Sequence, residues 1–246
     1  MDWSDEGIFL SGKPLGEANL IAEILTLEHG RHLGLVRGGG SRRIRPTLQP
    51  GNLVGVTWRA RLSEHLGGYN VELMEAHGAR ALDDARALAA IGTLGELAKL
   101  LPERDPHPEL YATTLHVLRS FGEPDIWPAL LVYWEFQLLQ ELGFGLDLSA
   151  CAATGVTEDL AYVSPRSGRA VSREGGEAYK ERLLTLPAFL LDQGAPLSAP
   201  DILAGFALTG FFLERDVLEP HGLAIPAARS RLLDLLQRPR NAALSA

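Results

Sequence analysis

The sequence predicts an α+β protein with more than one domain, in which an amino-terminal five-stranded β-barrel precedes an α-helical domain with a loop-rich insert. Two observations predict this order. The first eighty residues hold short apolar or alternating runs separated by Gly, Pro and Asn. After Asp83 the apolar residues recur every three or four positions instead. A chain of 246 residues can bury a core in both parts.

Five strands are expected within residues 1–80. They are Gly7–Leu10, Asn19–Thr26, His32–Val36, Leu53–Trp58 and Tyr69–Leu73. A partly open five-stranded Greek-key barrel is the OB-fold, which commonly binds single-stranded nucleic acid. We therefore expect residues 1–80 to be an OB-fold nucleic-acid-binding domain.

Residues 81–238 are expected to form the helical domain, with Asp83 or Asp84 capping a first helix that ends near Leu101. A loop-rich insert at about residues 148–176, with a short strand at Leu160–Val163, interrupts the helices. Residues 239–246 are expected to be a flexible tail. The further helices are expected at about Pro108–Phe121, Asp125–Leu142, Ala178–Leu191, Asp201–Leu218 and Ala227–Gln237.

Positive charge is concentrated in one window of an otherwise acidic chain. Between Glu28 and Glu64 there are seven arginines and no acid, whereas the whole chain has a formal net charge of −8. Removing the +7 of the window leaves −15 for all other residues. A chain that gathers its cations in this way is expected to hold a phosphate backbone there. The candidate DNA-binding residues are Arg31, Arg37, Arg42, Arg43, Arg45, Arg59 and Arg61, with Trp58 beside them.

The centre of this window is the loop of residues 37–46, RGGGSRRIRP. Its glycines are expected to give a mobile backbone, and its arginines can donate paired hydrogen bonds to phosphates. The alternative is a solvated basic loop that binds nothing. Arg31, directly after the turn at His29 and Gly30, is the weakest candidate. Trp58 is expected either to stack on a base or to lie in the barrel interior, which the alternation with Val54 and Val56 favours.

Several other classes of function are excluded by residue type. The glycine-rich loop has no lysine for a P-loop, and Arg43 stands where a dinucleotide fingerprint needs its third glycine. The seven histidines lack metal-ligand spacing, and no nucleophile elbow is present. We therefore expect no enzyme activity. No export signal or membrane-length apolar run is seen, so the cytoplasm is the expected compartment.

Several short segments, taken in order, resemble the RecO family of bacterial recombination mediators. Together they span nearly the whole chain. They are Asp5–Leu10, Gly16–Ile21, Thr26–Gly30, Leu35–Gly38, Leu48–Pro50, Leu100–Glu103 and Glu135–Phe144.

The resemblance implies an OB-fold followed by a helical domain, and a protein that binds single- and double-stranded DNA and anneals complementary strands. It also implies partners. Family members act with RecR, and in many bacteria RecF, to load RecA on gaps coated by single-stranded DNA-binding protein (SSB), whose acidic carboxy-terminal tail they contact. A cytoplasmic, nucleoid-associated protein is expected on this basis.

The insert departs from the family pattern. Many members carry a zinc knuckle there, built from two Cys-x-x-Cys pairs, whereas this chain has only Cys151. Thr154, Ser172 and Gly175 stand at the other three positions, so a tetrahedral thiolate site cannot form. We expect a degenerate zinc-knuckle region without metal, and no cofactor.

The leading hypothesis is a non-enzymatic mediator whose arginines hold DNA strands for pairing. The rival hypothesis is a protein-interaction adaptor, in which the OB-fold binds an acidic partner tail and DNA affinity is incidental. Both use the same arginines, so the sequence leaves the choice open.

Overall fold

The structure is a computed structural model that describes residues 1–192 and 194–238. The chain divides into two compact units, Met1–Gly122 and the part that begins at Glu123, and each is described by itself. The expected flexible tail at 239–246 lies outside the described residues.

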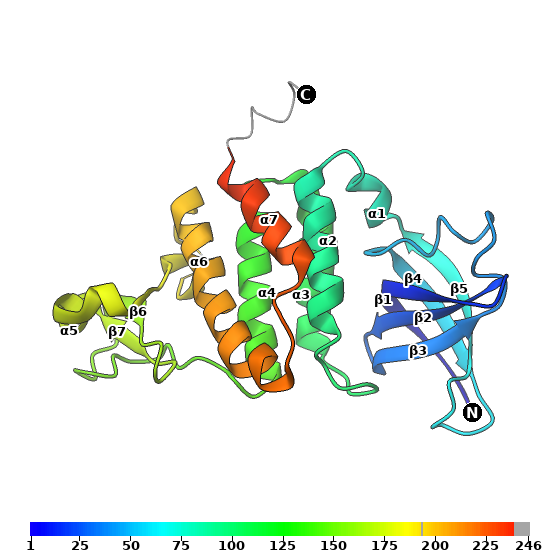
Figure 1. The fold of residues 1–246 in the computed structure, drawn as a ribbon, viewed down its shortest axis with the longest axis horizontal. Coiled ribbons are helices and arrows are strands. Elements are labelled where there is room, and N and C mark those ends of the chain that lie inside the picture. The colour runs from blue at the N-terminus through cyan, green and yellow to red at the C-terminus, as the bar shows by residue number, and fades with distance from the viewer. Residues whose placement is uncertain (193, 239–246) are drawn as a thin grey trace. The chain divides into compact units, whose positions relative to one another are not determined.

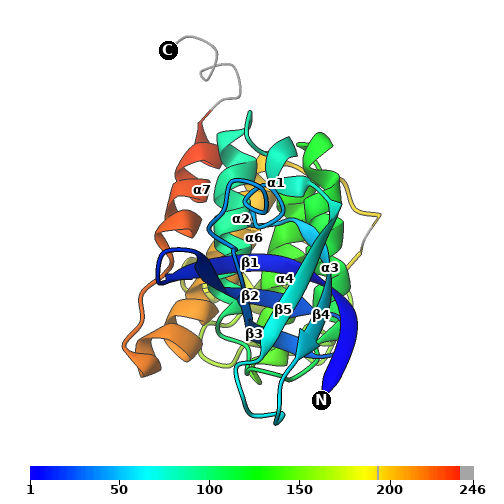
Figure 2. The same cartoon turned by 90° about the vertical axis from the view of Figure 1, so that its right-hand side faces the viewer.

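The first unit contains a closed five-stranded barrel, as the sequence predicts (Figures 1 and 2). Its strands are β1 (Asp2–Leu15), β2 (Asn19–Thr26), β3 (Gly30–Val36), β4 (Leu53–Arg59) and β5 (Gly68–Glu75). They follow the order β1-β2-β3-β5-β4, and β4 returns to pair with β1. All pairs are antiparallel except β3 with β5. The barrel is an OB-fold, so the fold class read from the sequence is confirmed.

Alternation of buried and exposed side chains builds the barrel interior. Along β3 every second residue is buried, from Gly30 to Val36, and β4 buries Val54, Val56 and Trp58. These side chains meet Phe9, Ile24, Tyr69 and Val71 in one apolar core. The outward residues of β4, including Thr57 and Arg59, are thereby left on the surface.

Strand β1 is much longer than the sequence pattern predicts. Its 14 residues pair with β4 on one edge and β2 on the other, and the pairing with β2 slips between Phe9 and Ser11. Gly7 permits the close approach of the strands, because a Cβ there would lie 2.5 Å from the Ile24 side chain. One strand thus serves two sheet edges and closes the barrel.

Three helices and a short 3₁₀ turn complete the first unit. They are α1 (His77–Arg80), α2 (Ala85–Ala98), α3 (Pro108–Arg119) and η1 (Ser120–Gly122). The Asp84 carboxylate accepts a hydrogen bond from the Arg86 amide and caps α2, as expected. The helices expected to begin a separate domain at residue 81 therefore pack within the same compact unit as the barrel.

The longer helices of the second unit are α4 (Trp127–Glu141), α6 (Ala199–Phe212) and α7 (Ala227–Gln237). A π-helical turn, η4 (Leu213–Leu218), and a 3₁₀ turn, η5 (Glu219–His221), extend α6. Arg229 of α7 is buried and bonds both carboxylate oxygens of Glu135 on α4, at 2.8 and 2.9 Å. Thr209 of α6 donates to the same carboxylate, so one ionic centre joins the three helices.

The insert between α4 and α6 is largely irregular. It holds β6 (Leu160–Val163), β7 (Ala170–Ser172), α5 (Arg173–Gly176), η2 (Glu177–Arg182), β8 (Leu184–Thr185) and η3 (Ala188–Leu190). The strand expected at Leu160–Val163 is present and lies between β7 and β8.

The prediction of a helix at Ala178–Leu191 is wrong. Leu184 and Thr185 pair instead with Val163 and Tyr162 of β6, and Pro187 prevents a helix from running through the segment. Local helical periodicity was overridden by strand pairing. In the described part of the chain, no helix has the length and apolar character needed to cross a membrane.

Candidate nucleic-acid interface

A groove with a volume of about 650 Å³ lies on the first unit where the barrel closes between β3 and β5. These strands pair at only two positions, Leu35 with Gly68 and Val36 with Tyr69. Next to this short seam, β4 ends at the exposed Arg59. The groove is lined by Leu35, Val36, Arg37, Ile44, Thr57, Arg59, Gly68, Tyr69, Asn70 and Val71.

Arg37 and Arg59 are brought to the same groove from separate strand ends. Arg37 directly follows β3, and Arg59 is the last residue of β4. Both are exposed, and the side chain of Arg59 is 75% accessible. Two guanidinium groups that line one groove can each bond a phosphate of a strand lying in it.

The basic loop between β3 and β4 is folded into turns, although its glycines predict a mobile backbone. Gly38 takes a positive φ of 68°, and the Gly40 amide donates to the Ala18 carbonyl of the β1–β2 turn. The Arg45 amide then donates to Ser41 in a helical turn. Ile44 packs on the barrel core and lines the groove. The packing of Ile44 holds the loop next to the groove, and the loop's side chains of Arg42, Arg43 and Arg45 are exposed.

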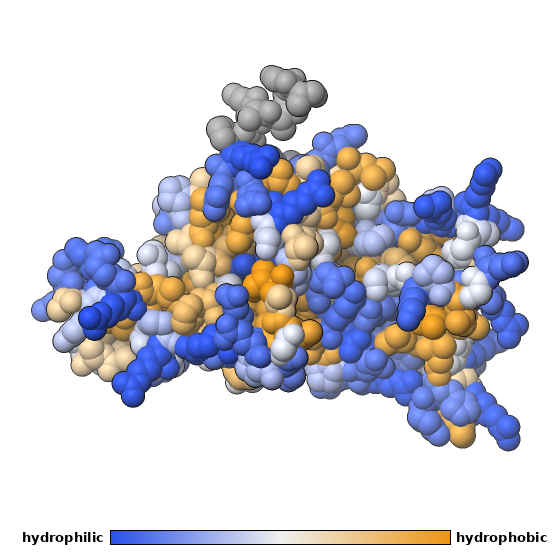
Figure 3. Space-filling view, viewed as in Figure 1, coloured by the Kyte–Doolittle hydropathy of each residue, from blue (hydrophilic) through white to orange (hydrophobic). Residues whose placement is uncertain are grey.

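Most of the candidate arginines have side chains free to bind an anion. In residues 1–192 and 194–238, five of them make no side-chain hydrogen bond or ion pair. They are Arg37, Arg42, Arg43, Arg45 and Arg61. Arg59 makes one loose ion pair with Asp2 at 3.8 Å, both side chains being exposed, and such surface pairs contribute little. Figure 3 shows hydrophilic side chains projecting from the barrel.

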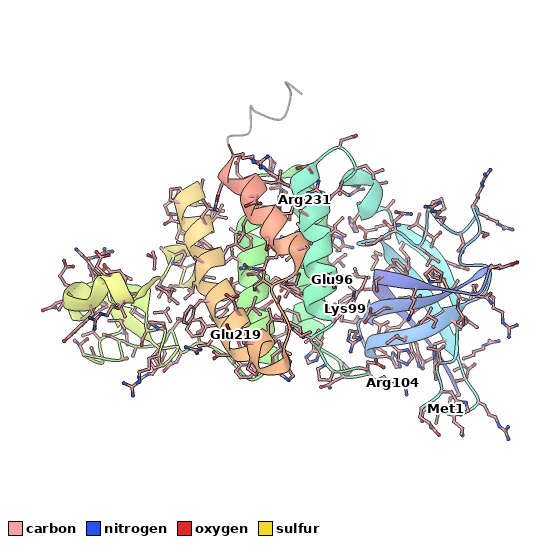
Figure 4. All side chains as sticks on the ribbon, viewed as in Figure 1. Met1, Glu96, Lys99, Arg104, Glu219 and Arg231 are labelled. Carbon is pink, nitrogen blue, oxygen red and sulfur yellow. The ribbon has the colours of Figure 1, made fainter. Side chains whose placement is uncertain are left out.

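Arg61 lies in the β4–β5 loop and does not line the groove. The loop is held by Arg104, whose guanidinium donates to the carbonyl oxygens of Ser63, Glu64 and His65. Figure 4 labels Arg104, which follows α2 in the chain. Arg104 therefore positions the loop that carries Arg61, and no pattern in the sequence indicates this contact.

Arg31 does not belong to this surface, which corrects its inclusion among the DNA-binding candidates. Its side chain is only 13% accessible. It bonds Glu23 on β2 at 2.5 Å and the Leu101 carbonyl at 2.9 Å. These contacts neutralise its charge and fix it inside the unit. The window contains no acid in the sequence, but strand pairing brings the carboxylate of Glu23 next to Arg31.

Trp58 also leaves the candidate set, because it is 2% exposed and cannot offer a face to a base. Its indole nitrogen donates to the Leu66 carbonyl, and its ring meets those of Trp3 and His32. Gly67 fits against the ring, since a Cβ there would lie 2.3 Å from the indole nitrogen. The interior position that strand alternation favours is the observed one.

Thr57, Asn70 and Ile44 line the groove but were not among the candidates from the sequence. A signal for Thr57 was present, because alternation places it on the opposite face from the buried Trp58. Asn70 is likewise the exposed neighbour of Tyr69. Nothing in the sequence indicates that β5 would bring it beside Thr57.

Comparison with known proteins bears on the whole chain. Residues 1–77 match the model of the recombination protein O N terminal family, and residues 82–224 match that of the recombination protein O C terminal family. The chain belongs to the recombination protein O family, RecO. A protein named DNA repair protein RecO from Methylocella silvestris is 52% identical over 95% of this chain and 95% of its own. The protein of that name from Afipia carboxidovorans is 52% identical over 98% of this chain and 98% of its own. The one from Methylorubrum populi is 50% identical over 96% of this chain and 98% of its own.

The four positions that the sequence comparison assigned to a degenerate zinc knuckle, Cys151, Thr154, Ser172 and Gly175, lie close together in space. The Ser172 hydroxyl donates to the Cys151 sulfur at 3.3 Å, and a Cβ on Gly175 would lie 3.2 Å from that sulfur and 3.4 Å from Thr154. Burial raises the pKa of the Cys151 thiol, but hydrogen bonds from Ser172 and Thr154 outweigh it and lower the pKa to about 6. Among the described residues, no three His, Cys, Asp or Glu side chains gather as a metal site.

Proposed function

We propose that this chain is a non-enzymatic recombination mediator that holds single-stranded DNA along the groove and basic loop of its barrel. The observation that carries the proposal is the convergence of Arg37 and Arg59 on one groove, beside a loop whose arginines have no partner among the described residues. Membership of the RecO family supports a role in DNA repair and recombination.

The charge distribution favours binding at this place. The residues outside the window of seven arginines carry a net charge of −15, so a polyanion is repelled from much of the chain and attracted here. Contacts to phosphate are independent of base sequence. A protein that holds strands through phosphates leaves their bases available for pairing, which suits annealing of complementary strands.

Membership of the family supports a wider role. We propose that the chain helps to load the recombinase RecA on gaps coated by SSB, with RecR and, in some bacteria, RecF as partners. It would bind both single- and double-stranded DNA, and contact the acidic tail of SSB. A cytoplasmic protein associated with the nucleoid would follow from this role.

The second candidate is an adaptor whose barrel binds an acidic partner tail, with incidental affinity for DNA. The same unpaired arginines favour it, because they accept carboxylates as readily as phosphates. Competition separates the two. If an acidic tail peptide displaces single-stranded DNA completely and binds more tightly than DNA at the same salt, the adaptor is favoured.

Strand annealing tests the mediator directly. Two complementary labelled oligonucleotides are mixed with the protein, and pairing is followed by fluorescence. Wild-type protein is expected to accelerate pairing, and a variant with Arg37, Arg42, Arg43, Arg45 and Arg59 changed to Gln is expected to lose the acceleration. Arg231→Gln, an exposed arginine of α7 labelled in Figure 4, is the control. Equal annealing by the five-residue variant would contradict the proposal.

A further inference from the structure

The outer face of β1, β4 and β5 carries one uncharged polar row. Ser4 pairs with Thr57 across β1 and β4, and Thr57 pairs with Asn70 across β4 and β5. Directly opposed residues on one face of a sheet lie within about 5 Å of each other. Ser4, Thr57 and Asn70 therefore form a continuous ladder, and its last two members line the groove.

The neighbouring rows differ in charge. On one side the row is Asp2, Arg59 and Gly68, and on the other it is Glu6, Gly55 and Glu72. A DNA strand is attracted to the side of Arg59, where the Asp2 pair is loose at 3.8 Å, and repelled from the side of Glu6 and Glu72. These charges favour a strand path over the uncharged row rather than over the acidic row.

Within that row Asn70 has hydrogen-bonding groups to offer. The hydroxyl oxygens of Ser4 and Thr57 lie 3.0 Å apart and share a hydrogen bond. The Asn70 side chain is exposed and makes no hydrogen bond within the described residues. Its neighbours on β5, Tyr69 and Val71, are buried. Asn70 is thus the polar side chain that β5 presents to the groove.

The chemistry of the amide suits a nucleobase better than a phosphate. An Asn side chain has two N–H donors and a carbonyl acceptor, the combination that pairs with base edges. A phosphate oxygen can only accept, and the arginines at the rim already serve it. The groove therefore combines ionic groups for the backbone with a neutral donor and acceptor for the bases.

We propose that Asn70, with Thr57 beside it, forms a subsite that contacts the unpaired bases of single-stranded DNA and makes the groove prefer single strands to duplex. The inference rests on the proposed DNA-binding function. In a duplex the Watson–Crick edges are engaged with the other strand, so they are not offered to a shallow groove on a sheet. In a single strand they are free to turn toward Asn70.

The experiment compares the salt dependence of binding for single-stranded and duplex oligonucleotides of one sequence, measured by fluorescence anisotropy. Asn70→Ala is expected to weaken single-strand binding about three- to tenfold, the usual loss for one neutral hydrogen bond. The slope of log affinity against log salt should stay unchanged, because no phosphate contact is lost. Duplex affinity should also stay unchanged. Asn70→Val, which suits a strand and also lacks hydrogen-bonding groups, should behave in the same way.

Two controls bracket these variants. Arg59→Gln should reduce the magnitude of the single-strand slope by about 0.7 if one phosphate contact is lost. Thr113→Ala, a change of a half-buried side chain on α3 of the same unit that is not among the groove-lining residues, should alter neither affinity nor slope.

Each result is decisive. If both Asn70 variants bind single strands as the wild type does, or weaken single strands and duplex equally, the subsite is contradicted while Arg59→Gln still reports on the groove. If the wild type binds neither form of DNA, the proposed function itself fails.

Discussion

Arg31 on β3 bonds Glu23 on β2 at 2.5 Å, and the pair is nearly buried, with side-chain accessibilities of 13% and 12%. The Arg31 Nε also donates to the Leu101 carbonyl at 2.9 Å. An arginine held on two sides in this way acts on stability and has no freedom to reach a DNA strand. The basic window of the sequence therefore contains two kinds of arginine.

Arg31→Met is expected to destabilise the protein by about 1–3 kcal/mol, because it leaves the Glu23 carboxylate and the Leu101 carbonyl without their donor. Affinity for single-stranded DNA should not change. Urea unfolding and anisotropy titration on the same sample measure both quantities. A large loss of affinity with unchanged unfolding would return Arg31 to the binding surface.

Charge reversal of Arg42, Arg43 and Arg45 to Glu is expected to weaken DNA binding and to leave stability nearly unchanged, the opposite of Arg31→Met. These side chains are exposed and have no partner among the described residues, so the thermal transition should move little. Binding should weaken for every DNA sequence tested, since phosphate contacts carry no base information. Unchanged affinity would place the site elsewhere on the protein.

The lowered pKa of the buried His32 predicts that the protein loses stability in mild acid. Burial, with a smaller contribution from Arg104, lowers the pKa of His32 from 6.5 to about 4. Below pH 6.5 the His32 side chain therefore binds a proton in the unfolded chain, whereas in the folded protein it stays neutral until about pH 4. Stability is fully present above pH 6.5 and falls toward pH 4, by about 3 kcal/mol for this shift.

The histidine can be tested by substitution because its ring shares a hydrogen bond with the Tyr69 hydroxyl, at 3.0 Å. His32→Gln can keep a hydrogen bond but does not titrate. The difference in unfolding free energy between wild type and variant should shrink or change sign as the pH falls from 6.5 to 4. A constant difference across this window would contradict the assignment.

The Arg229–Glu135 pair predicts strong coupling within the second unit. Arg229→Met should cost about 3–5 kcal/mol, because it leaves a buried carboxylate without a counter-charge. Adding Glu135→Leu should recover much of this loss, since an apolar pair needs no ionic partner. Denaturant unfolding of Arg229→Met, Glu135→Leu and the double variant measures the coupling, with exposed Arg231→Met as the control. Additive losses in the double variant would show that the two groups act independently.

The fold was accessible from the sequence where local pattern and tertiary pairing agree. Strand alternation identified the five barrel strands and indicated the interior place of Trp58, and Asp84 indicated the start of α2. Prediction failed at 178–191, where pairing with β6 decides the structure and local periodicity does not. It also missed the length of β1, because pairing with two neighbours cannot be read from one segment.

The candidate site was only partly accessible. Arg37, Arg59 and the loop arginines were identified by charge, and charge is visible in sequence. The acid that neutralises Arg31 lies eight residues away on a neighbouring strand, and Asn70 reaches Thr57 only through the register of β4 with β5. Such neighbours depend on strand pairing, so composition and spacing do not reveal them.

The salt dependence of single-strand binding tests the central claim most directly. If four of the arginines at the groove and loop contact phosphates, log affinity should fall against log salt with a slope of about −3, from 0.7 for each contact. Arg37→Gln with Arg59→Gln should reduce the magnitude of that slope by about 1.4. A wild-type slope near zero, or a slope that these two substitutions leave unchanged, would contradict the account.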